Sequence, residues 1–346
     1  MPIAMRKLRV LVLMHDEVVP PPDAESRPAA EQWDYLMEIS VVRTLCALGH
    51  EVHGLGVADE LRPIRDAIAE KKPHIVFNIV SFFHDVVAYE AHVVSLLELC
   101  KQPYTGCNPR GIVLAGDKAL SKQVLAWHRI PVPAFAVFAP QRRARLPRRM
   151  AFPVIVKAAA EHGSAGIAQA SVVRDDRELA ERVDFLHRTL HGDVIVEQFL
   201  PGREFSIAVL GNDRLTTFPI WETWFDKLPA GNEPIATARV KWDPSYQERV
   251  GLRSERARDL PPELEQRIDR IARRTYRALH LSGYARIDVR MDEHGRVFVL
   301  EANVNPDLSP GEDFPAAAKH ANVDYPELLQ RILATGLAYR PAWKVD

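Results

Sequence analysis

Apolar runs alternate with helical segments over the first hundred residues, and this alternation limits the possible folds most. The run "LRVLVLM" at 8–14 is continuously apolar, which is typical of a parallel strand buried on both faces. Segments with helical spacing at 30–48 and in "LRPIRDAIAEKK" separate it from two further strand-like runs, "HEVHGLGV" and "PHIVFNIV". Strands that alternate with helices form a parallel sheet covered by helices. We therefore expect a doubly wound, Rossmann-like α/β domain over residues 1–105.

The rest of the chain predicts α+β organisation in two further units, 106–198 and 199–346. The first should contain a helix over 115–128 and the strands "FPVIVKAAA" and "VIVEQFL" around a helix over 176–190. The second should contain the strands "REFSIAVLG" and "RLTTFPIW", helices over 262–280 and 324–336, and a β-hairpin between those helices. The expected fold class is therefore α/β with α+β subdomains.

Composition excludes several classes of protein. The net charge of the 346 residues is -1, which gives no reason to expect binding to nucleic acid or to an anionic membrane. The three cysteines, Cys46, Cys100 and Cys107, suit neither a disulfide framework nor a zinc site. No apolar run has the length of a membrane span, and the first run is too short and lacks the cleavage site of a signal peptide. We expect a reduced, cytoplasmic location.

The hairpin around the turn "DEHG" (292–295) mixes polar side chains with core residues. If the turn takes four residues, Asp288 lies opposite Val299, and Glu301 lies diagonal to Asp288 at about 7–8 Å between α-carbons. Strand alternation then puts Asn303 on the same face as both carboxylates. The opposite, core face is expected to carry five apolar residues: Ile287, Val289, Phe298, Leu300 and Ala302.

Asp288, Glu301 and Asn303 would form a patch that contains only oxygen donors. Two neighbouring carboxylates repel each other unless a cation or a proton lies between them. Oxygen ligands without His or Cys favour Mg²⁺ or Mn²⁺. The alternative is a solvated strand face on which Asp288 pairs with Arg286 or Arg290. The hairpin pattern alone leaves both interpretations open.

Two lysines and a glycine-containing loop precede this hairpin. Lys157 ends the apolar strand "FPVIVK", and the loop after it contains Gly163 and Gly166, whose amides could cover phosphate oxygens. Lys118 lies near a helix start in "DKALSK". Each feature alone also fits a solvent-exposed strand or helix end, but their succession before the hairpin favours a nucleotide cleft.

Four motifs in this order resemble the ATP-grasp superfamily and, within it, the D-alanine–D-alanine ligase-like enzymes. They are "YTGCNP…DKALSK", "FPVIVK…HGSAG", "VEQFLPGREF" and "GYARIDVR…VLEANVNP". The resemblance includes sequence motifs over residues 100–310, whereas over the first 100 residues only the order of strands and helices is similar. It implies an ATP-grasp fold, in which a Rossmann-like N-terminal domain precedes two α+β subdomains, 106–198 and 199–346, that clasp ATP.

The resemblance also implies roles for single residues. Six residues are implied to bind ATP: Lys118, Lys157, Glu197, Gln198, Leu200 and Glu204. Residues 197, 198 and 200 would form the hinge that holds adenine, and residue 204 would contact the ribose. Two Mg²⁺ (or Mn²⁺) ions are implied at Asp288, Glu301 and Asn303. Three residues are implied to be catalytic: Arg286 at the acyl phosphate, Lys241 at the γ-phosphate, and Ser164 in the loop that closes over the phosphates.

The amino-acid pocket departs from the family pattern. The family has a glycine where this chain has Asp307, and Glu312 and Asp313 follow shortly afterwards. The glycine-rich N-terminal loop of the family is replaced by "MHDEVVPPPD". We therefore expect intact ATP machinery beside a rebuilt pocket for an amine that is cationic or lacks a free carboxylate. Glu17, His84 and Asp307 are the candidate substrate contacts.

The predicted function is an ATP-dependent carboxylate–amine ligase that forms a C–N bond through an acyl phosphate and releases ADP and phosphate. Its partners would be small amino acids, peptides or amines, and the helix over 30–48 could support a homodimer. Two alternatives stay open: a true D-alanine–D-alanine ligase, and a non-catalytic regulatory protein that binds ATP.

Overall fold

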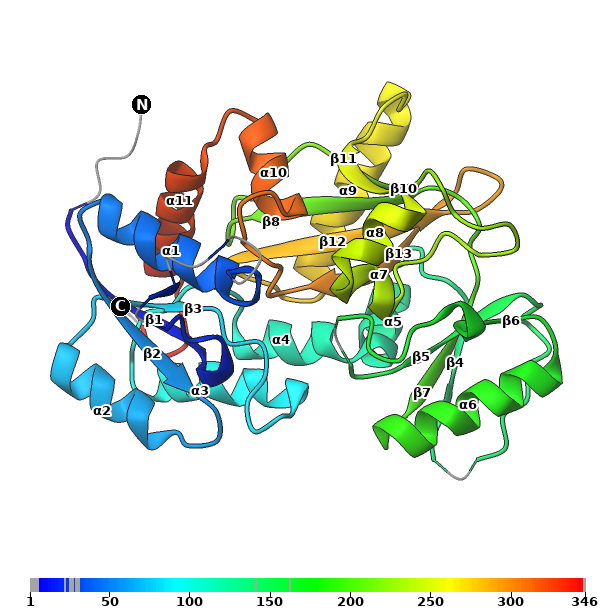
Figure 1. Ribbon diagram of the computed structural model, residues 1–346, viewed down its shortest axis with the longest axis horizontal. Coiled ribbons are helices and arrows are strands. Elements are labelled where there is room, and N and C mark those ends of the chain that lie inside the picture. Colours follow the sequence, from blue (N-terminus) through cyan, green and yellow to red (C-terminus); the bar gives the residue numbers. More distant parts are fainter. Residues whose placement is uncertain are drawn as a thin grey trace.

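Three β-sheets organise the chain (Figure 1). The computed structural model describes residues 6–21, 23–24, 28, 32–140, 142–161 and 163–344. One sheet lies in each of the units expected from the sequence, although the boundaries at 105/106 and 198/199 stay predictions. The mixed α/β class with α+β parts is confirmed.

The first sheet is parallel, with β1 (Arg9–His15) between β2 (Glu51–Val57) and β3 (Ile75–Asn78). Three helices belong to this part: α1 (Leu36–Ala47), α2 (Arg62–Lys71) and α3 (Glu90–Leu99). The helix expected to begin at residue 30 begins at Leu36, after a 3₁₀ turn (Trp33–Tyr35). Residues 30 and 31 lie outside the described residues.

Two short helices replace the single helix expected over 115–128. They are α4 (Pro109–Gly116) and α5 (Lys118–Trp127), and they lie between the first sheet and the strands β5 and β7 in Figure 1. Asp117 separates them because it has an extended backbone, and its carboxylate accepts hydrogen bonds from the N–H groups of Ala119 and Leu120. An aspartate in this N-cap position starts a new helix, and it fixes Lys118 at the first position of α5.

The second sheet is antiparallel and has the order β4 (Phe135–Phe138), β7 (Val194–Gln198), β5 (Val154–Ala158), β6 (Val172–Val173). Helix α6 (Asp176–Leu190) covers one face and packs on Val154, Val156 and Val196. Because strand side chains alternate, Lys157 and Glu197 lie on the opposite face.

The third sheet has the order β11 (Leu252–Arg256), β10 (Trp221–Phe225), β8 (Glu204–Leu210), β12 (Tyr284–Met291), β13 (Val297–Asn303), with β9 (Thr216–Thr217) paired to β8. Five helices accompany it: α7 (Ala238–Trp242), α8 (Pro244–Val250), α9 (Pro262–Ala278), α10 (Asp313–His320) and α11 (Tyr325–Ala338). The long strand expected in "RLTTFPIW" is split in two, with Pro219 between the parts, because proline lacks the N–H that a ladder needs.

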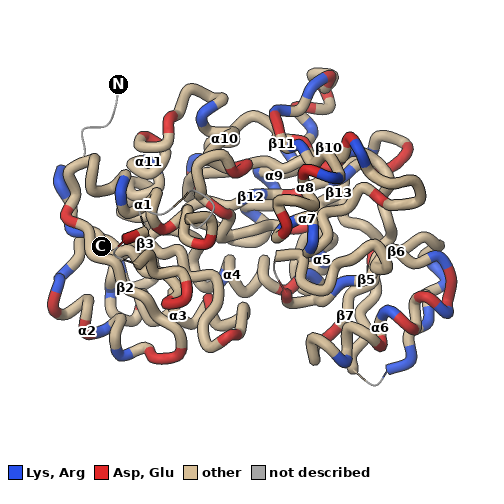
Figure 2. The backbone as a smooth tube through the Cα atoms, in the orientation of Figure 1, with Lys and Arg blue, Asp and Glu red and all other residues tan. Residues whose placement is uncertain are grey.

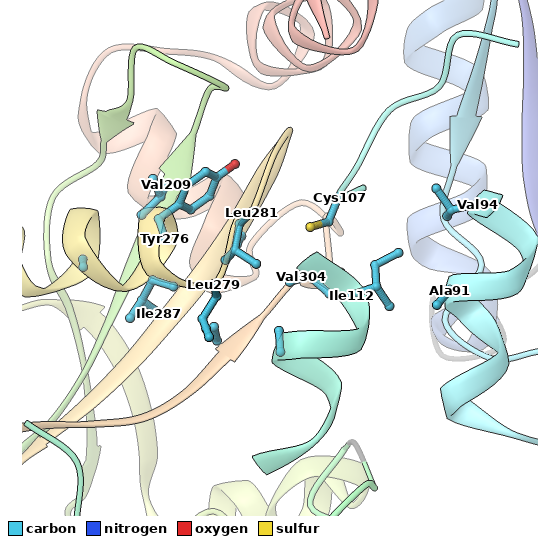
Figure 3. Packing of buried hydrophobic residues seen from close by; sticks show 14 of the residues in the cluster. Ala91, Val94, Cys107, Ile112, Val209, Tyr276, Leu279, Leu281, Ile287 and Val304 are labelled. Atoms are coloured by element: carbon cyan, nitrogen blue, oxygen red, sulfur yellow. The ribbon is translucent and has the colours of Figure 1, made fainter. Parts of the chain in front are cut away.

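One apolar core joins the first and the third sheets. It contains Leu11 of β1 and Ile287 of β12. Figure 3 shows Val94 of α3 and Ile112 of α4 on one side of this core and Leu279 on the other. Lys, Arg, Asp and Glu residues are interspersed over the view in Figure 2. Within the described residues, no helix has the length and apolarity that crossing a membrane requires.

Candidate active site

The hairpin of β12 and β13 contains a β-bulge beside the carboxylates. Val289 lies opposite Val299, whereas the preceding Asp288 lies opposite Glu301. Leu300 is therefore an extra residue on β13. An extra residue exchanges the faces of the strand beyond it, so Glu301 shares the face of Asp288.

The length of the turn and the bulge together correct the predicted register. Glu301 lies directly opposite Asp288 rather than diagonal to it. Val297 and Val299 occupy the core face, whereas Phe298 and the bulge residue, which were expected there, are only half-buried. The prediction was wrong for two reasons. The turn takes five residues rather than four, so that Met291 lies opposite Val297 and Phe298 leaves the core face. The apolar run also covers both faces of β13, so that alternation cannot reveal where the extra residue lies.

Asp288 is buried and forms a two-pronged ion pair with Arg286. The guanidinium donates from Nε to Oδ1 at 2.8 Å and from Nη2 to Oδ2 at 2.9 Å. Burial raises the pKa of Asp288 to about 6, Arg286 opposes this, and Glu301 and Glu204 add to it. Burial therefore disfavours the charged form of this carboxylate even though its arginine partner favours it.

The other two predicted metal ligands lie on the same face of the hairpin. Glu301 is half-buried, and its Oε2 lies 3.5 Å from Nζ of Lys118. Asn303 lies opposite Arg286, and its Oδ1 accepts the N–H of Asn305 at 3.1 Å. Among the described residues, no group of three His, Cys, Asp or Glu side chains could hold a metal ion. The donor set here is two carboxylates and an amide.

A buried carboxylate on β7 holds two lysines. Oε2 of Glu197 lies 3.1 Å from Nζ of Lys157, and Oε1 lies 3.1 Å from Nζ of Lys122. Burial would raise the pKa of Glu197, but the two ammonium groups lower it below its ordinary value. Burial would likewise lower the pKa of Lys157, but Glu197 and Glu301 raise it. The resemblance placed this side chain at adenine, which stays a prediction, and in the structure its carboxylate contacts the charged ends of both lysines.

The predicted ribose ligand, Glu204, pairs with a buried arginine on the neighbouring strand. Oε2 of Glu204 lies 3.0 Å from Nη1 of Arg290. Arg290 also donates to the carbonyls of Gly202 and Pro234. These bonds fix the rotamer of Glu204 at the start of β8.

The remaining hinge residues follow β7. The backbone N–H of Gln198 donates to the carbonyl of Ala134 at 2.8 Å, and its side chain donates to the carbonyl of Pro153 at 3.0 Å. Leu200 is buried. The backbone N–H of Gln198 therefore already has a hydrogen-bond acceptor within the protein, the carbonyl of Ala134.

Two loops meet above these strands. The N–H of Ala238 donates to the carbonyl of Ile167 at 3.0 Å, and Nε1 of Trp242 donates to the carbonyl of Gly163 at 3.2 Å. Gln169 adds two hydrogen bonds to the backbone of Glu233. The loop that contains Ser164, which has a φ of 61°, is thus tied to the segment before α8.

Lys241 lies on α7, in the second of these loops. Its ammonium is 5.5 Å from the centre of the Trp242 ring. Desolvation, followed by repulsion from Arg286, lowers the pKa of Lys241, while Glu301 and Asp288 oppose the shift. The predicted γ-phosphate lysine is therefore electrostatically coupled to the hairpin carboxylates.

Three acidic residues follow the hairpin. Asp313 accepts the hydroxyl of Ser206 at 3.3 Å, and Ser206 lies opposite Asp288 on the neighbouring strand. Desolvation raises the pKa of Glu312 to about 7, with further contributions from Asp307 and Asp313. These residues therefore interact with one another and with the hairpin face.

The N-terminal candidates are less closely connected to this face. Glu17 is exposed, and its Oε2 lies 3.8 Å from Nδ1 of His15. His84 is exposed in a left-handed conformation with a φ of 58°, and its N–H donates to the carbonyl of Ala58. No contact within the described part of the chain joins either side chain to Asp288 or Glu301.

Lys122, and the pairing of Arg290 with Glu204, were not predicted from the sequence. Both had a spacing signal. Lys122 follows Lys118 by four residues on one helix face, and Arg290 follows Asp288 by two residues on one strand face.

Comparisons with known proteins identify the family. The family described as "D-ala D-ala ligase C-terminus" matches residues 124–334. A D-alanine–D-alanine ligase from Bordetella pertussis is 32% identical over 243 residues, 69% of this chain and 71% of that protein. An uncharacterized protein of Sinorhizobium fredii, y4sG, is 30% identical over 304 residues, 85% of each chain.

Solved structures show the same fold. A D-alanine–D-alanine ligase from Bacillus anthracis, complexed with ATP, covers 95% of this chain and 97% of its own, with a TM-score of 0.72 and 21% identity. A ligase from Coxiella burnetii has a TM-score of 0.69 at 19% identity, covering 96% of this chain and 94% of its own. The fold is therefore ATP-grasp.

The chain belongs to the D-alanine–D-alanine ligase family. It is an enzyme of the ATP-grasp class, whose family members form a C–N bond and release ADP and phosphate.

Proposed function

We propose that this enzyme joins a carboxylate to an amine through an acyl phosphate. The observation that supports this most is the pairing of Glu301 with Asp288 beside Lys118. Two carboxylates face each other at the edge of a site that also contains Lys157 and Lys241. Such a site is built to bring a triphosphate and a second anion together.

In the first step, an oxygen of the substrate carboxylate attacks the γ-phosphorus of ATP, and the bond to the β-phosphate oxygen breaks. The products are an acyl phosphate and ADP. Lys118 and Lys157 neutralise phosphate oxygens, and Lys241 reaches the γ-phosphate from the loop that closes the site. The loop contact between Trp242 and Gly163 supports exclusion of water, which would hydrolyse the acyl phosphate.

In the second step, the amine nitrogen attacks the acyl carbon, phosphate leaves, and the nitrogen loses a proton. Arg286 would stabilise the negative oxygen of the tetrahedral intermediate. In the structure Arg286 is occupied by Asp288. Because a guanidinium has five N–H donors and Asp288 accepts from only two of them, Arg286 could serve the reacting group while it stays paired with Asp288.

The hairpin donors fit magnesium. Asp288, Glu301 and Asn303 offer only oxygen atoms, and the two carboxylates lie directly opposite each other, where a cation between them would relieve their repulsion. These three residues would hold two Mg²⁺ ions, whose chemistry is to neutralise the β- and γ-phosphate oxygens. Each oxygen of Asp288 accepts one hydrogen bond from Arg286 and keeps a second lone pair, so Asp288 could hold a cation while it stays paired with Arg286.

We further propose that the amine substrate is cationic or lacks a free carboxylate. Asp307, Glu312 and Asp313 interact with one another near Arg286 and Lys241. Glu38 is 4% exposed and lies near Asp307. An anionic end of an amino acid would be repelled here. Such a specificity would distinguish the enzyme from a true D-alanine–D-alanine ligase.

Phosphate release in the presence of ATP and Mg²⁺ tests both proposals. We expect little release with D-alanine alone and strong release with a carboxylate paired with a diamine or an amidated amino acid. Equal or stronger release with D-alanine alone would favour the true D-alanine–D-alanine ligase. No stimulated release with any member of an amine and carboxylate library, despite ATP binding, would favour the regulatory alternative.

A further inference from the structure

Lys122 and its partner Glu197 are the most deeply buried charged side chains in the described part of the site. Each side chain is 1% exposed. Lysine is almost never buried to this extent unless it is paired. One such pair would account for the burial, but the ammonium has a second contact that a simple ion pair does not need.

The second contact is the backbone carbonyl of Leu300, to which the ammonium of Lys122 donates. Leu300 is the bulge residue of β13, and it has no partner residue on β12. A bulge disrupts the ladder and leaves backbone groups in need of other partners. Lys122 supplies such a partner from α5.

This bulge determines where Glu301 points. Without the extra residue, Leu300 would lie opposite Asp288, and Glu301 would face the core. Lys118 lies one helical turn before Lys122 and contacts Glu301 itself at 3.5 Å. Helix α5 therefore contacts the carboxylate of Glu301 through Lys118, and it contacts the bulge that orients Glu301 through Lys122.

The same ammonium also acts on the second sheet. Lys122 and Lys157 share the two oxygens of Glu197, each at 3.1 Å. Displacement of Lys122 would leave Glu197 buried with one cation and would change the position of Lys157. The contacts of Lys122 thus connect β7 in one sheet with β13 in another.

We propose that Lys122 is a positioning residue that couples the nucleotide lysine Lys157 to the metal carboxylate Glu301. It touches neither substrate nor metal. This inference rests on the proposed function, because it assigns the phosphates to Lys157 and magnesium to Glu301. It goes beyond that function in one respect, because it states that a single residue, Lys122, affects both the affinity for the nucleotide and the affinity for Mg²⁺.

Two binding measurements without turnover test the coupling. Calorimetry gives the Kd of a non-hydrolysable ATP analogue at saturating Mg²⁺, and the Mg²⁺ midpoint at saturating analogue. Lys122→Met should raise both by about tenfold, the lower end expected for outer-shell partners. Glu197→Gln should raise the Kd but leave the midpoint within about twofold, because Lys122 still holds Leu300. Lys319→Met, an exposed lysine on α10, is the matched control.

A folded Lys122→Met protein with a lower Tm but an unchanged Mg²⁺ midpoint would overturn the proposal in favour of a purely structural lysine. If Lys122→Met does not fold, the double variant Lys122→Met/Glu197→Gln removes the Lys122–Glu197 pair as a unit, while Lys157 keeps the charge of Glu301 nearby. Its Mg²⁺ midpoint should exceed that of Glu197→Gln by about tenfold. Equal midpoints would reject the coupling.

The wild-type protein separates this inference from the proposed function. If the wild type binds neither the analogue nor Mg²⁺, the ligase proposal itself fails. If it binds both and the variants bind equally well, only the role of Lys122 fails.

Discussion

The indole N–H of Trp242 donates to the carbonyl of Gly163 at 3.2 Å and joins the two loops of the proposed phosphate site. A β-carbon placed on Gly163 would lie 3.3 Å from the same ring. The indole therefore packs directly on the backbone of the loop that contains Ser164, even though 68% of its surface is exposed. We interpret this contact as a latch between the loops.

Replacing Trp242 by Phe keeps an aromatic ring but removes the donor. A neutral hydrogen bond contributes about 1 kcal/mol, or roughly fivefold, so the KM for ATP should rise by about that factor while the Tm changes little. Steady-state kinetics and limited proteolysis of the 163–167 loop measure the effect. Trp127→Phe, at the exposed end of α5, is the control. An unchanged KM together with unchanged proteolysis would reject the latch.

Glu301→Gln should abolish turnover without unfolding the protein. The substitution removes the charge opposite Asp288 but keeps the size of the side chain, and we expect kcat to fall by about a hundredfold or more. Phosphate release together with circular dichroism measures both outcomes. Glu293→Gln, an exposed residue in the turn of the same hairpin, should be nearly neutral. Near-normal ligation by Glu301→Gln would contradict the metal assignment.

The sequence predicted which side chains share a face but not how they reach it. Asp288, Glu301 and Asn303 do lie on one face, as the motif order and the strand period indicated. The bulge at Leu300 could not be read from the strand because apolar residues fill both faces there. A bulge depends on contacts from elsewhere in the chain, and in this protein the contact comes from Lys122, which is 178 residues away.

The contacts of Glu197 with Lys122 and Lys157 also depend on residues that are distant in the sequence. The sequence motif predicted that Glu197 ends an apolar strand, and the family resemblance predicted that it contacts adenine. The structure surrounds its carboxylate with Lys122 of α5 and Lys157 of β5. Spacing within one segment cannot reveal a pair formed between a helix and two strands. Local signals such as the Asp117 cap, by contrast, were present in the sequence and could have been used.

Glu90 should make stability depend on pH. It is buried at the start of α3, and burial raises its pKa from 4.5 to about 8. A raised folded-state pKa means that the folded protein binds the proton more tightly than the unfolded chain. The corresponding stability is complete below pH 4.5 and is lost as the pH rises towards 8.

Replacing Glu90 by Gln removes this titration. The Tm of the variant minus that of the wild type should therefore increase between pH 5 and pH 8, by a few degrees in total. Calorimetric scans at intervals of half a pH unit measure the difference. Glu60→Gln, at an exposed position, should give a flat difference. A flat difference for Glu90→Gln as well would show that Glu90 titrates normally in the folded protein.

Removing the charge of Asp307 tests the proposed specificity for the amine substrate. Its Oδ1 accepts the N–H of Ser309 at 2.7 Å. Because Asn can keep that hydrogen bond, Asp307→Asn removes the charge but preserves the loop. Two unit charges about 4 Å apart in water interact by ~1 kcal/mol, or roughly fivefold. The KM for an amine that bears a free carboxylate should therefore fall by about fivefold, and the KM for its amidated counterpart should stay constant or rise.

The ratio of the two KM values is the decisive quantity, because a general disturbance of the loop would change both in the same direction. Asp213→Asn, in an exposed turn remote from the hairpin in sequence, should leave the ratio unaltered. If Asp307→Asn also leaves it unaltered, repulsion by Asp307 does not determine which amine is accepted. The proposed specificity for the amine would then fail, and D-alanine would again be the first substrate to test.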